Sequence, residues 1–280
     1  MRFFLCFLFL SILILANNAM CAQVGNIADP SAMSVGRFSG ERPLALLGGL
    51  EADFISGKKF DGQTNNFKFK FYGMKIGSVI RDTLFVYGIF GVGNITDTKK
   101  IYDYDPPSTV ANVQINYLDM DTGTDFVYGV GITAIMHEAK LDEGVYFRLG
   151  FDAKYRRISF DSNDCYVNLT NYDQASAVQN YPVSYAMNVN EFQATLVASY
   201  QYEKFAPYIG YSITDWNGEE EIVANSFTSG NINYNGSLET NGTKGYCIGL
   251  TYYISKTFAI NLEGRERHEE AYTINAQMRF

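Results

Sequence analysis

Charged residues, tryptophan, histidine and long apolar runs are all scarce in this chain of 280 residues. Asp, Glu, Lys and Arg make up 19% of it, with Trp 1, His 2 and Pro 6, whereas Tyr 21, Phe 21 and Gly 25 are abundant. Low charge and many aromatics exclude intrinsic disorder. The lack of a second long apolar run excludes a polytopic helical membrane protein. The net charge of -8 disfavours nucleic acid as a partner, because phosphates require clusters of Lys and Arg.

The first 22 residues are typical of a secretory signal peptide. Arg2 supplies a positive start, and Phe3 to Ala16 is almost unbroken apolar sequence. This stretch of about 14 residues is shorter than the ~20 that a transmembrane helix needs. Small residues follow, so cleavage after Ala19 or Ala22 is plausible. The alternative is an uncleaved anchor helix. Residues 23–43 are then expected to form a periplasmic N-terminal segment.

Apolar and polar residues alternate with a period of two through most of the remaining chain, which is the pattern of β-strands. In one example, Phe192, Leu196 and Tyr200 share a face, and polar residues such as Gln193 lie between them. Ten strands are predicted, although eight or twelve also fit. Their spans are Leu44–Ser56, Asn66–Val79, Thr83–Ile95, Asp125–His137, Gly144–Phe160, Val189–Tyr202, Ala206–Trp216, Lys244–Ser255, Thr257–Arg267 and Ala271–Phe280.

Through the middle of the chain the connections between these strands alternate between short and long, whereas Gly57–Asn65 and His268–Glu270 are of intermediate or short length. The long ones are Thr96–Thr124, Asp161–Asn188 and Asn217–Thr243, and the last of them contains alternation that predicts a projecting hairpin. Short turns on one side and long loops on the other are typical of an all-β, up-and-down antiparallel transmembrane barrel. In hydrocarbon every backbone N–H and C=O must be paired, so a sheet there closes on itself. The prediction is one barrel over residues 44–280, with a soluble β-sandwich or lipocalin-like barrel as the alternative.

In such a barrel the apolar rows face lipid and the charged side chains face the lumen. Mixed charges in a lumen that ten strands leave nearly filled are expected to pair with one another, which favours structural ion pairs over ion selectivity. The predicted lumen charges are Glu51, Asp53, Lys68, Lys70, Arg148, Asp152, Lys154, Arg156, Glu263 and Arg265.

The last strand carries the most specific signal. It ends on an aromatic residue, with apolar residues at alternate positions before it, namely Tyr272, Ile274, Ala276, Met278 and Phe280. This strand resembles the C-terminal recognition strand of bacterial outer-membrane proteins. The resemblance implies location in the cell outer membrane, contact with its lipid, and recognition by the barrel assembly machinery. Phe205–Gly210 and Gly249–Ile260 also resemble segments of small porin-like outer-membrane barrels.

A second resemblance lies near the predicted start of the mature chain. Val24–Met33 is similar to the opening of chlamydial major outer-membrane porins. It implies a chlamydia-like or similar Gram-negative source.

The sequence predicts no enzyme, no metal site and no cofactor. Cys165 and Cys247 remain after signal removal, and either form one disulfide or stay as two thiols. An alternative comes from omptin-type surface proteases, which share the ten-strand barrel and use an aspartate pair facing an Asp–His pair. Asp119 and Asp121 lie in one predicted outer loop and His268 in another, but the Asp-x-His element is absent.

Three functions are compatible with the sequence. The favoured one is a structural or surface-interaction role, in which the long loops contact an extracellular ligand. The alternative is a narrow porin for small solutes. The least favoured is an omptin-like protease at the rim.

Overall fold

The structure, a computed structural model, describes residues 44–58, 67–80, 83–99, 113–121, 123–171, 178–227, 230–255, 257–266 and 270–280. The predicted signal peptide (1–22) and N-terminal segment (23–43) lie outside these residues. The strands are β1 (Leu44–Lys58), β2 (Phe67–Ile80), β3 (Leu84–Lys99), β4 (Val113–Asp121), β5 (Asp125–Asp142), β6 (Val145–Asn171), β7 (Val178–Tyr202), β8 (Phe205–Phe227), β9 (Gly230–Tyr253), β10 (Phe258–Glu266) and β11 (Glu270–Arg279).

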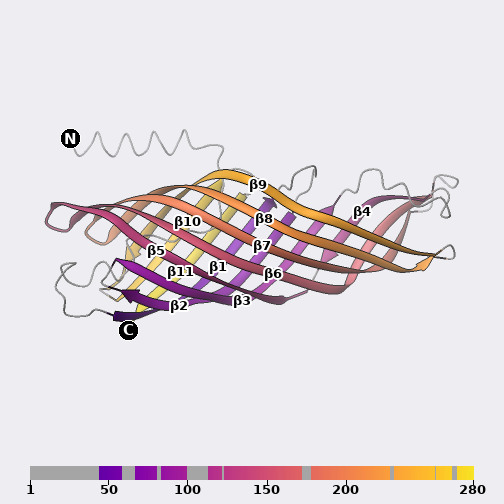
Figure 1. Cartoon of the computed structure of the whole chain (residues 1–280), viewed down its shortest axis with the longest axis horizontal. Coiled ribbons are helices and arrows are strands. Elements are labelled where there is room, and N and C mark those ends of the chain that lie inside the picture. The colour runs from indigo at the N-terminus through magenta and orange to yellow at the C-terminus, as the bar shows by residue number, and fades with distance from the viewer. Residues whose placement is uncertain are drawn as a thin grey trace.

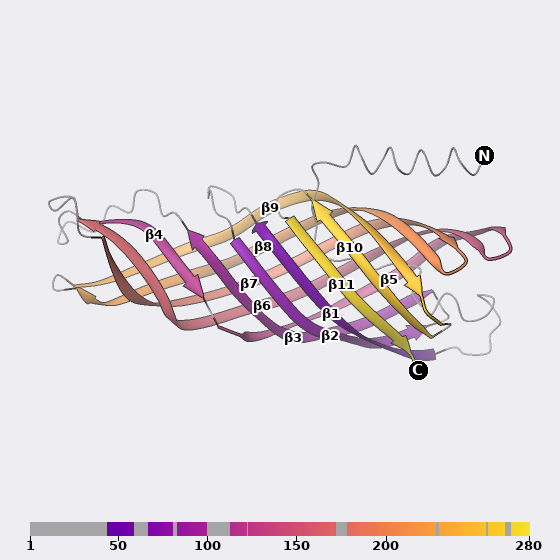
Figure 2. The same ribbon diagram turned by 180° about the vertical axis from the view of Figure 1, so that it is seen from behind.

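Ten of these strands close into an antiparallel barrel (Figures 1 and 2). β1 pairs with β2 on one side and with β11 on the other, so the first and last strands join the sheet. The backbone N–H of Phe280 also donates to the carbonyl of Leu46 at 2.9 Å. The predicted fold class is therefore confirmed, and each predicted strand corresponds to one strand of the barrel. None of the described segments forms a helix long and apolar enough to cross a membrane.

β4 was missed by the sequence analysis, which placed it inside the long loop Thr96–Thr124. It pairs with the end of β3 and the end of β6, beyond the point where β5 begins. β4 and β5 run in the same direction and are separated by a short break at Gly123, whose φ is 66°. Glycine adopts this left-handed conformation without steric cost. β4 therefore continues the part of the barrel wall that β5 forms between β3 and β6.

β6, β7, β8 and β9 also extend well beyond their predicted ends. β6 runs to Asn171 and β7 starts at Val178, so most of the predicted loop Asp161–Asn188 is strand. β8 runs to Phe227 and β9 starts at Gly230, which confirms the predicted hairpin in the last long loop. Figures 1 and 2 show these strands reaching far past β10 and β11 at one end of the barrel. Together with β4 they form a sheet that we call the extension.

The outer surface of the barrel wall carries a belt of exposed apolar side chains. They include Leu50 on β1, Ile76 on β2, Val130 on β5, Phe192 on β7 and Ile274 on β11. The same strands point polar side chains inward, such as Gln193 and Asn275, which are almost fully buried. An apolar outside and a polar inside invert the arrangement of a soluble barrel and match a barrel in lipid.

At the start of β2, close to the extension, the apolar side chains face the lumen and the charged side chains face outward. Phe69 and Phe71 are fully buried in the lumen, whereas Lys68 and Lys70 are exposed on the outer surface. The prediction that these two lysines face the lumen was therefore wrong. The alternation fixes which residues share a face, but it does not say which face is inside. The lysines avoid burial because this part of β2 lies beside the polar extension.

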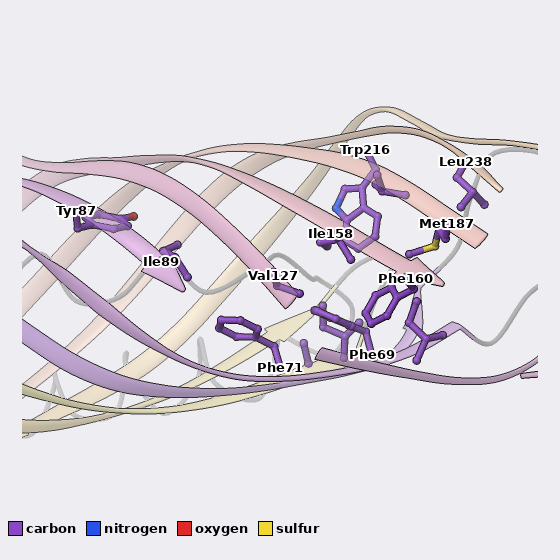
Figure 3. Packing of buried hydrophobic residues seen from close by; sticks show 14 of the residues in the cluster. Phe69, Phe71, Tyr87, Ile89, Val127, Ile158, Phe160, Met187, Trp216 and Leu238 are labelled. Carbon is purple, nitrogen blue, oxygen red and sulfur yellow. The ribbon is translucent and has the colours of Figure 1, made fainter. Parts of the chain in front are cut away.

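A cluster of buried apolar side chains fills the lumen at this level and continues under the extension (Figure 3). Phe69 and Phe160 pack edge to face, with ring centroids 6.1 Å apart. Met187, Trp216 and Leu238 continue the cluster from β7, β8 and β9. Because these side chains have 2% or less of their surface exposed, the barrel is closed here by its own side chains.

Candidate functional sites in the lumen and on the extension

One ion-pair network crosses the lumen. Arg156 on β6 lies 2.6 Å from Glu191 on β7 (Nε to Oε2) and 3.5 Å from Asp53 on β1 (Nη1 to Oδ2). β1 and β6 are separated by β2, β3 and β5 around the wall, so the contact with Asp53 bridges the barrel interior. Arg265 on β10 also pairs with Asp53, which accepts a further hydrogen bond from Thr273 at 2.9 Å. We call these groups the crossing network.

The crossing network rests directly on the apolar cluster. The guanidinium carbon of Arg156 lies 5.5 Å from the ring centroid of Phe69 and 5.6 Å from that of Phe71. These are cation–π distances. Arg156 and Asp53 are almost completely buried. A layer of paired charge therefore stands against a layer of aromatic rings, and both occupy the lumen.

A second polar group lies on the other side of the crossing network. Asp152 on β6 accepts hydrogen bonds from the Tyr87 hydroxyl at 2.8 Å and from Thr133 at 2.7 Å. Lys75 lies 4.2 Å from the centroid of the Tyr87 ring. Lys154, next to Asp152 on the same inner face, is buried as well. Opposite charges again lie side by side, which lowers the cost of burying each of them.

A third group surrounds Tyr208 on β8. Its hydroxyl donates to Glu263 at 2.7 Å and accepts from Asn261 at 2.9 Å, both on β10. The ring lies across Gly249 on β9, where a Cβ atom would stand 2.1 Å from the ring carbon Cζ. Only glycine leaves room for the ring at this position. The tyrosine therefore ties β8, β9 and β10 together from inside.

The predicted lumen charges divide into two sets. Eight side chains are buried inside, as the prediction has them, and two, Lys68 and Lys70, are outside. The eight are Glu51, Asp53, Arg148, Asp152, Lys154, Arg156, Glu263 and Arg265. Lys75 and Glu191 are further buried charges that were not predicted, although each is in phase with inward residues on its strand. The aromatic partners Tyr87 and Tyr208 were also missed.

The predicted assembly signal forms an exposed row on β11. Tyr272, Ile274, Met278 and Phe280 are exposed on the outer surface, and Ala276 between them is half-buried. Asn275 and Gln277 point inward and are buried. The row therefore belongs to the apolar belt, and its reading by the assembly machinery stays a prediction.

The side chains of the hypothetical rim protease lie outside the described residues, so that hypothesis stays a prediction. Asp119 and Asp121 belong to β4, but their side chains are outside the described part, and so is His268. The Cys165 side chain is outside it as well, so the pairing of Cys165 with Cys247 stays untested. Within the described residues no group of three His, Cys, Asp or Glu side chains could hold a metal ion.

Where its side chains are described, the outer face of the extension on β6 and β7 is polar, in contrast to the apolar belt of the barrel wall. Arg157, Ser159, Asn188 and Asn190 form a ladder of hydrogen bonds across β6 and β7, including Ser159 to Asn188 at 2.7 Å and Arg157 to Asn190 at 2.9 Å. A hollow of about 390 Å³ lies beside this ladder, lined by residues 219–221 of β8, residues 235–237 of β9, and Ala186 and Asn188 of β7. The extension therefore stands outside the lipid.

Comparisons with known proteins give no family for this chain. No family model matches the chain, and no curated protein matches it. The outer-membrane protease OmpT of Escherichia coli is 13% identical with a TM-score of 0.44, covering 89% of this chain and 99% of that one. The translocator domain of the Neisseria meningitidis autotransporter NalP is 8% identical, with a TM-score of 0.41 and coverages of 89% and 92%. The Pseudomonas putida toluene transporter TodX is 9% identical, with a TM-score of 0.37 and coverages of 94% and 95%.

Identities this low say nothing about activity. The resemblance of Val24–Met33 to chlamydial porins finds no counterpart in these comparisons and stays a prediction. The closed barrel, its apolar belt and its polar interior define the class of protein, a transmembrane β-barrel. The apolar belt is the surface of this barrel that contacts membrane lipid. Location in the outer membrane of a bacterium stays a prediction.

Proposed function

We propose that the protein is a non-conducting outer-membrane barrel whose extension serves as a surface for external partners. It is not an enzyme in this proposal, and it needs no cofactor. The barrel assembly machinery inserts it by reading the row of β11 that ends at Phe280. The observation that carries the proposal is the crossing network, in which Asp53, Arg156 and Glu191 span the lumen against Phe69 and Phe71.

The lumen chemistry supports a structural role over a transport role. A solute path needs free polar groups and space, whereas the charges of the crossing network are engaged with opposite charges from neighbouring and opposite strands. Ten strands enclose a lumen only slightly wider than the eight-strand barrels that side chains fill. The narrow porin is the competing function, and it predicts a measurable current.

Conductance across a planar lipid bilayer separates the two functions. We expect the wild-type protein to give no stepwise current. Replacing both inner rings, Phe69→Ala with Phe71→Ala, is expected to produce current steps because it removes the aromatic layer that supports Arg156. Phe54→Ala with Tyr72→Ala is the matched control. These rings pack against each other on the outer side, 5.7 Å apart and edge to face, so their loss leaves the lumen closed.

Reproducible current steps from the wild-type protein would contradict the proposal and favour the narrow porin. A closed wild type together with a conducting inner-ring variant would support it.

A further inference from the structure

The β8–β9 hairpin has one free edge along most of its projecting length. Residues 230–245 of β9 pair with β8 on one side, and β10 joins β9 only from Tyr246 onward. Within the described part of the chain, nothing pairs with the other side of residues 230–245. This edge is visible in Figures 1 and 2, where β9 continues past the ends of β10 and β11. At about 3.3 Å per residue it is roughly 50 Å long.

An exposed edge of this length is a template for another strand. Its outward N–H and C=O groups offer hydrogen bonds to any extended chain laid beside it. Proteins usually block long edges with proline, with lysine or with a covering loop. Residues 230–245 contain no proline, and Lys244 stands at one extreme end of the edge. The residues of this edge therefore do not block the addition of another strand.

The hairpin beside this edge is acidic. From Asp215 to Lys244 it carries five carboxylates and one lysine. Glu219, Glu221 and Glu239 are exposed on its outer face, and the first two line the hollow of about 390 Å³. Asn235 and Ser237 of β9 line the other side of the hollow, so the hollow lies next to the edge strand. A side chain from an added strand can reach it.

We infer that the free edge of β9 binds an extended basic peptide segment, which adds to the sheet as a further antiparallel or parallel strand. The inference deepens the proposed surface role and rests on it. Backbone hydrogen bonds supply the affinity, and Lys or Arg at alternate positions of the segment approach the carboxylates of the hairpin. Alternate spacing is required because residues i and i+2 of a strand share a face.

A second copy of this chain fits the edge less well. Pairing of β9 with β9 of another copy puts two acidic hairpins in one sheet, and the carboxylates that each β8 carries then repel those of the other copy. A basic segment reverses the sign of that interaction. Charge complementarity therefore selects the peptide.

The test uses the full-length barrel refolded in detergent and a soluble peptide of about nine residues that alternates Lys and Thr, the length of an ordinary strand. Binding is measured by fluorescence anisotropy of the labelled peptide. The first control is the same peptide N-methylated at every second residue on its pairing edge, which keeps the charge and removes the backbone donors. The second is the variant Glu219→Gln with Glu221→Gln. Its matched control is Asp142→Asn with Glu143→Gln, two exposed acids at the turn between β5 and β6.

We expect the unmodified peptide to bind and the N-methylated peptide to bind at least about tenfold more weakly, because several backbone hydrogen bonds are lost. The Glu219/Glu221 variant is expected to weaken binding about 3- to 10-fold, which is the range of two exposed ion pairs. The Asp142/Glu143 variant is expected to leave it unchanged.

Three results would overturn the inference. They are no binding by the wild type, equal binding of the N-methylated peptide, or binding that appears only after residues 23–43 are deleted. The last result would assign the edge to the protein's own N-terminal segment. Failure of this inference can be distinguished from failure of the proposed function. If the protein neither binds the peptide nor conducts, the inference is wrong and the closed barrel still stands. If the protein gives current steps, the closed barrel is wrong whether or not the peptide binds.

Discussion

Arg156→Met is expected to lower the free energy of unfolding by about 3–5 kcal/mol, the usual cost of removing one partner from a buried ion pair. Methionine keeps most of the side-chain volume, so the change removes charge more than packing. Glu191 loses the guanidinium at 2.6 Å, and Asp53 loses the partner that reaches it across the lumen. The measurement is urea unfolding of the refolded barrel, followed by the fluorescence of Trp216, which lies in the apolar cluster.

Arg157→Met is the matched control, one residue along the same strand. Arg157 points to the outer face, where it donates to Asn190 at 2.9 Å and is only partly buried, so its loss is expected to cost less than about 1 kcal/mol. The double change Arg156→Met with Glu191→Gln is expected to recover part of the stability, since it also removes the uncompensated carboxylate. Equal effects at Arg156 and Arg157 would show that the crossing network contributes nothing.

Gly249→Ala is expected to cost about 2–4 kcal/mol. A methyl group at Gly249 would stand 2.1 Å from Cζ and 2.3 Å from Oη of Tyr208, so the ring must leave its place. Overpacking of this kind costs about 1–3 kcal/mol, and the ring also gives up its hydrogen bond to Glu263. The same unfolding measurement reads the effect.

Gly264→Ala on β10 is the matched control. There the nearest atom to an added Cβ is Cδ1 of Tyr272 at 4.0 Å, so the change is expected to be nearly neutral. Tyr208→Phe isolates the hydroxyl and is expected to fall between the two glycine variants. If Gly249→Ala lowered the free energy of unfolding no more than Gly264→Ala, the contact between Tyr208 and Gly249 would not contribute to stability.

The strands inside the membrane could be predicted from the sequence because the lipid and the lumen impose opposite demands on neighbouring residues. Phe192 faces lipid and Gln193 faces the lumen, so the alternation is strong on β7. In the extension the lipid no longer requires an apolar outer face, and the segments there are rich in Asn, Asp, Ser and Thr, which are typical of loops. That is why β4 and the outer halves of β6 and β7 were read as loops.

The direction of each face is a separate problem, and Lys68 and Lys70 illustrate it. On most strands the charged face points inward, and the same rule predicts that the two lysines of β2 face the lumen. Near the extension the medium outside is no longer apolar, so the aromatic face of β2 takes the interior and the lysines take the outside. A sequence alone does not state the height at which the membrane ends.

The partners within the crossing network could not be predicted either. The alternation predicts that Asp53, Arg156 and Arg265 point into the lumen. Their contacts, however, join β1, β6 and β10 across the interior of the barrel. Which residues meet depends on the shear of the barrel, and shear depends on the register of every pair of strands. Glu191 lies within the predicted strand Val189–Tyr202 and in phase with Gln193, so its inward direction could have been predicted.

The belt and the extension on β7 give the most direct test of the central claim that this chain is a barrel in lipid with a polar sheet above it. An environment-sensitive fluorophore is attached to single cysteines at Phe192, Leu196 or Asn188 in a cysteine-free background, and all three positions are exposed on the outer face. After reconstitution into vesicles, brominated lipid is expected to quench the labels at Phe192 and Leu196, and iodide in the buffer is expected to quench the label at Asn188. Iodide quenching of all three labels alike, with no effect of the brominated lipid, would contradict the account.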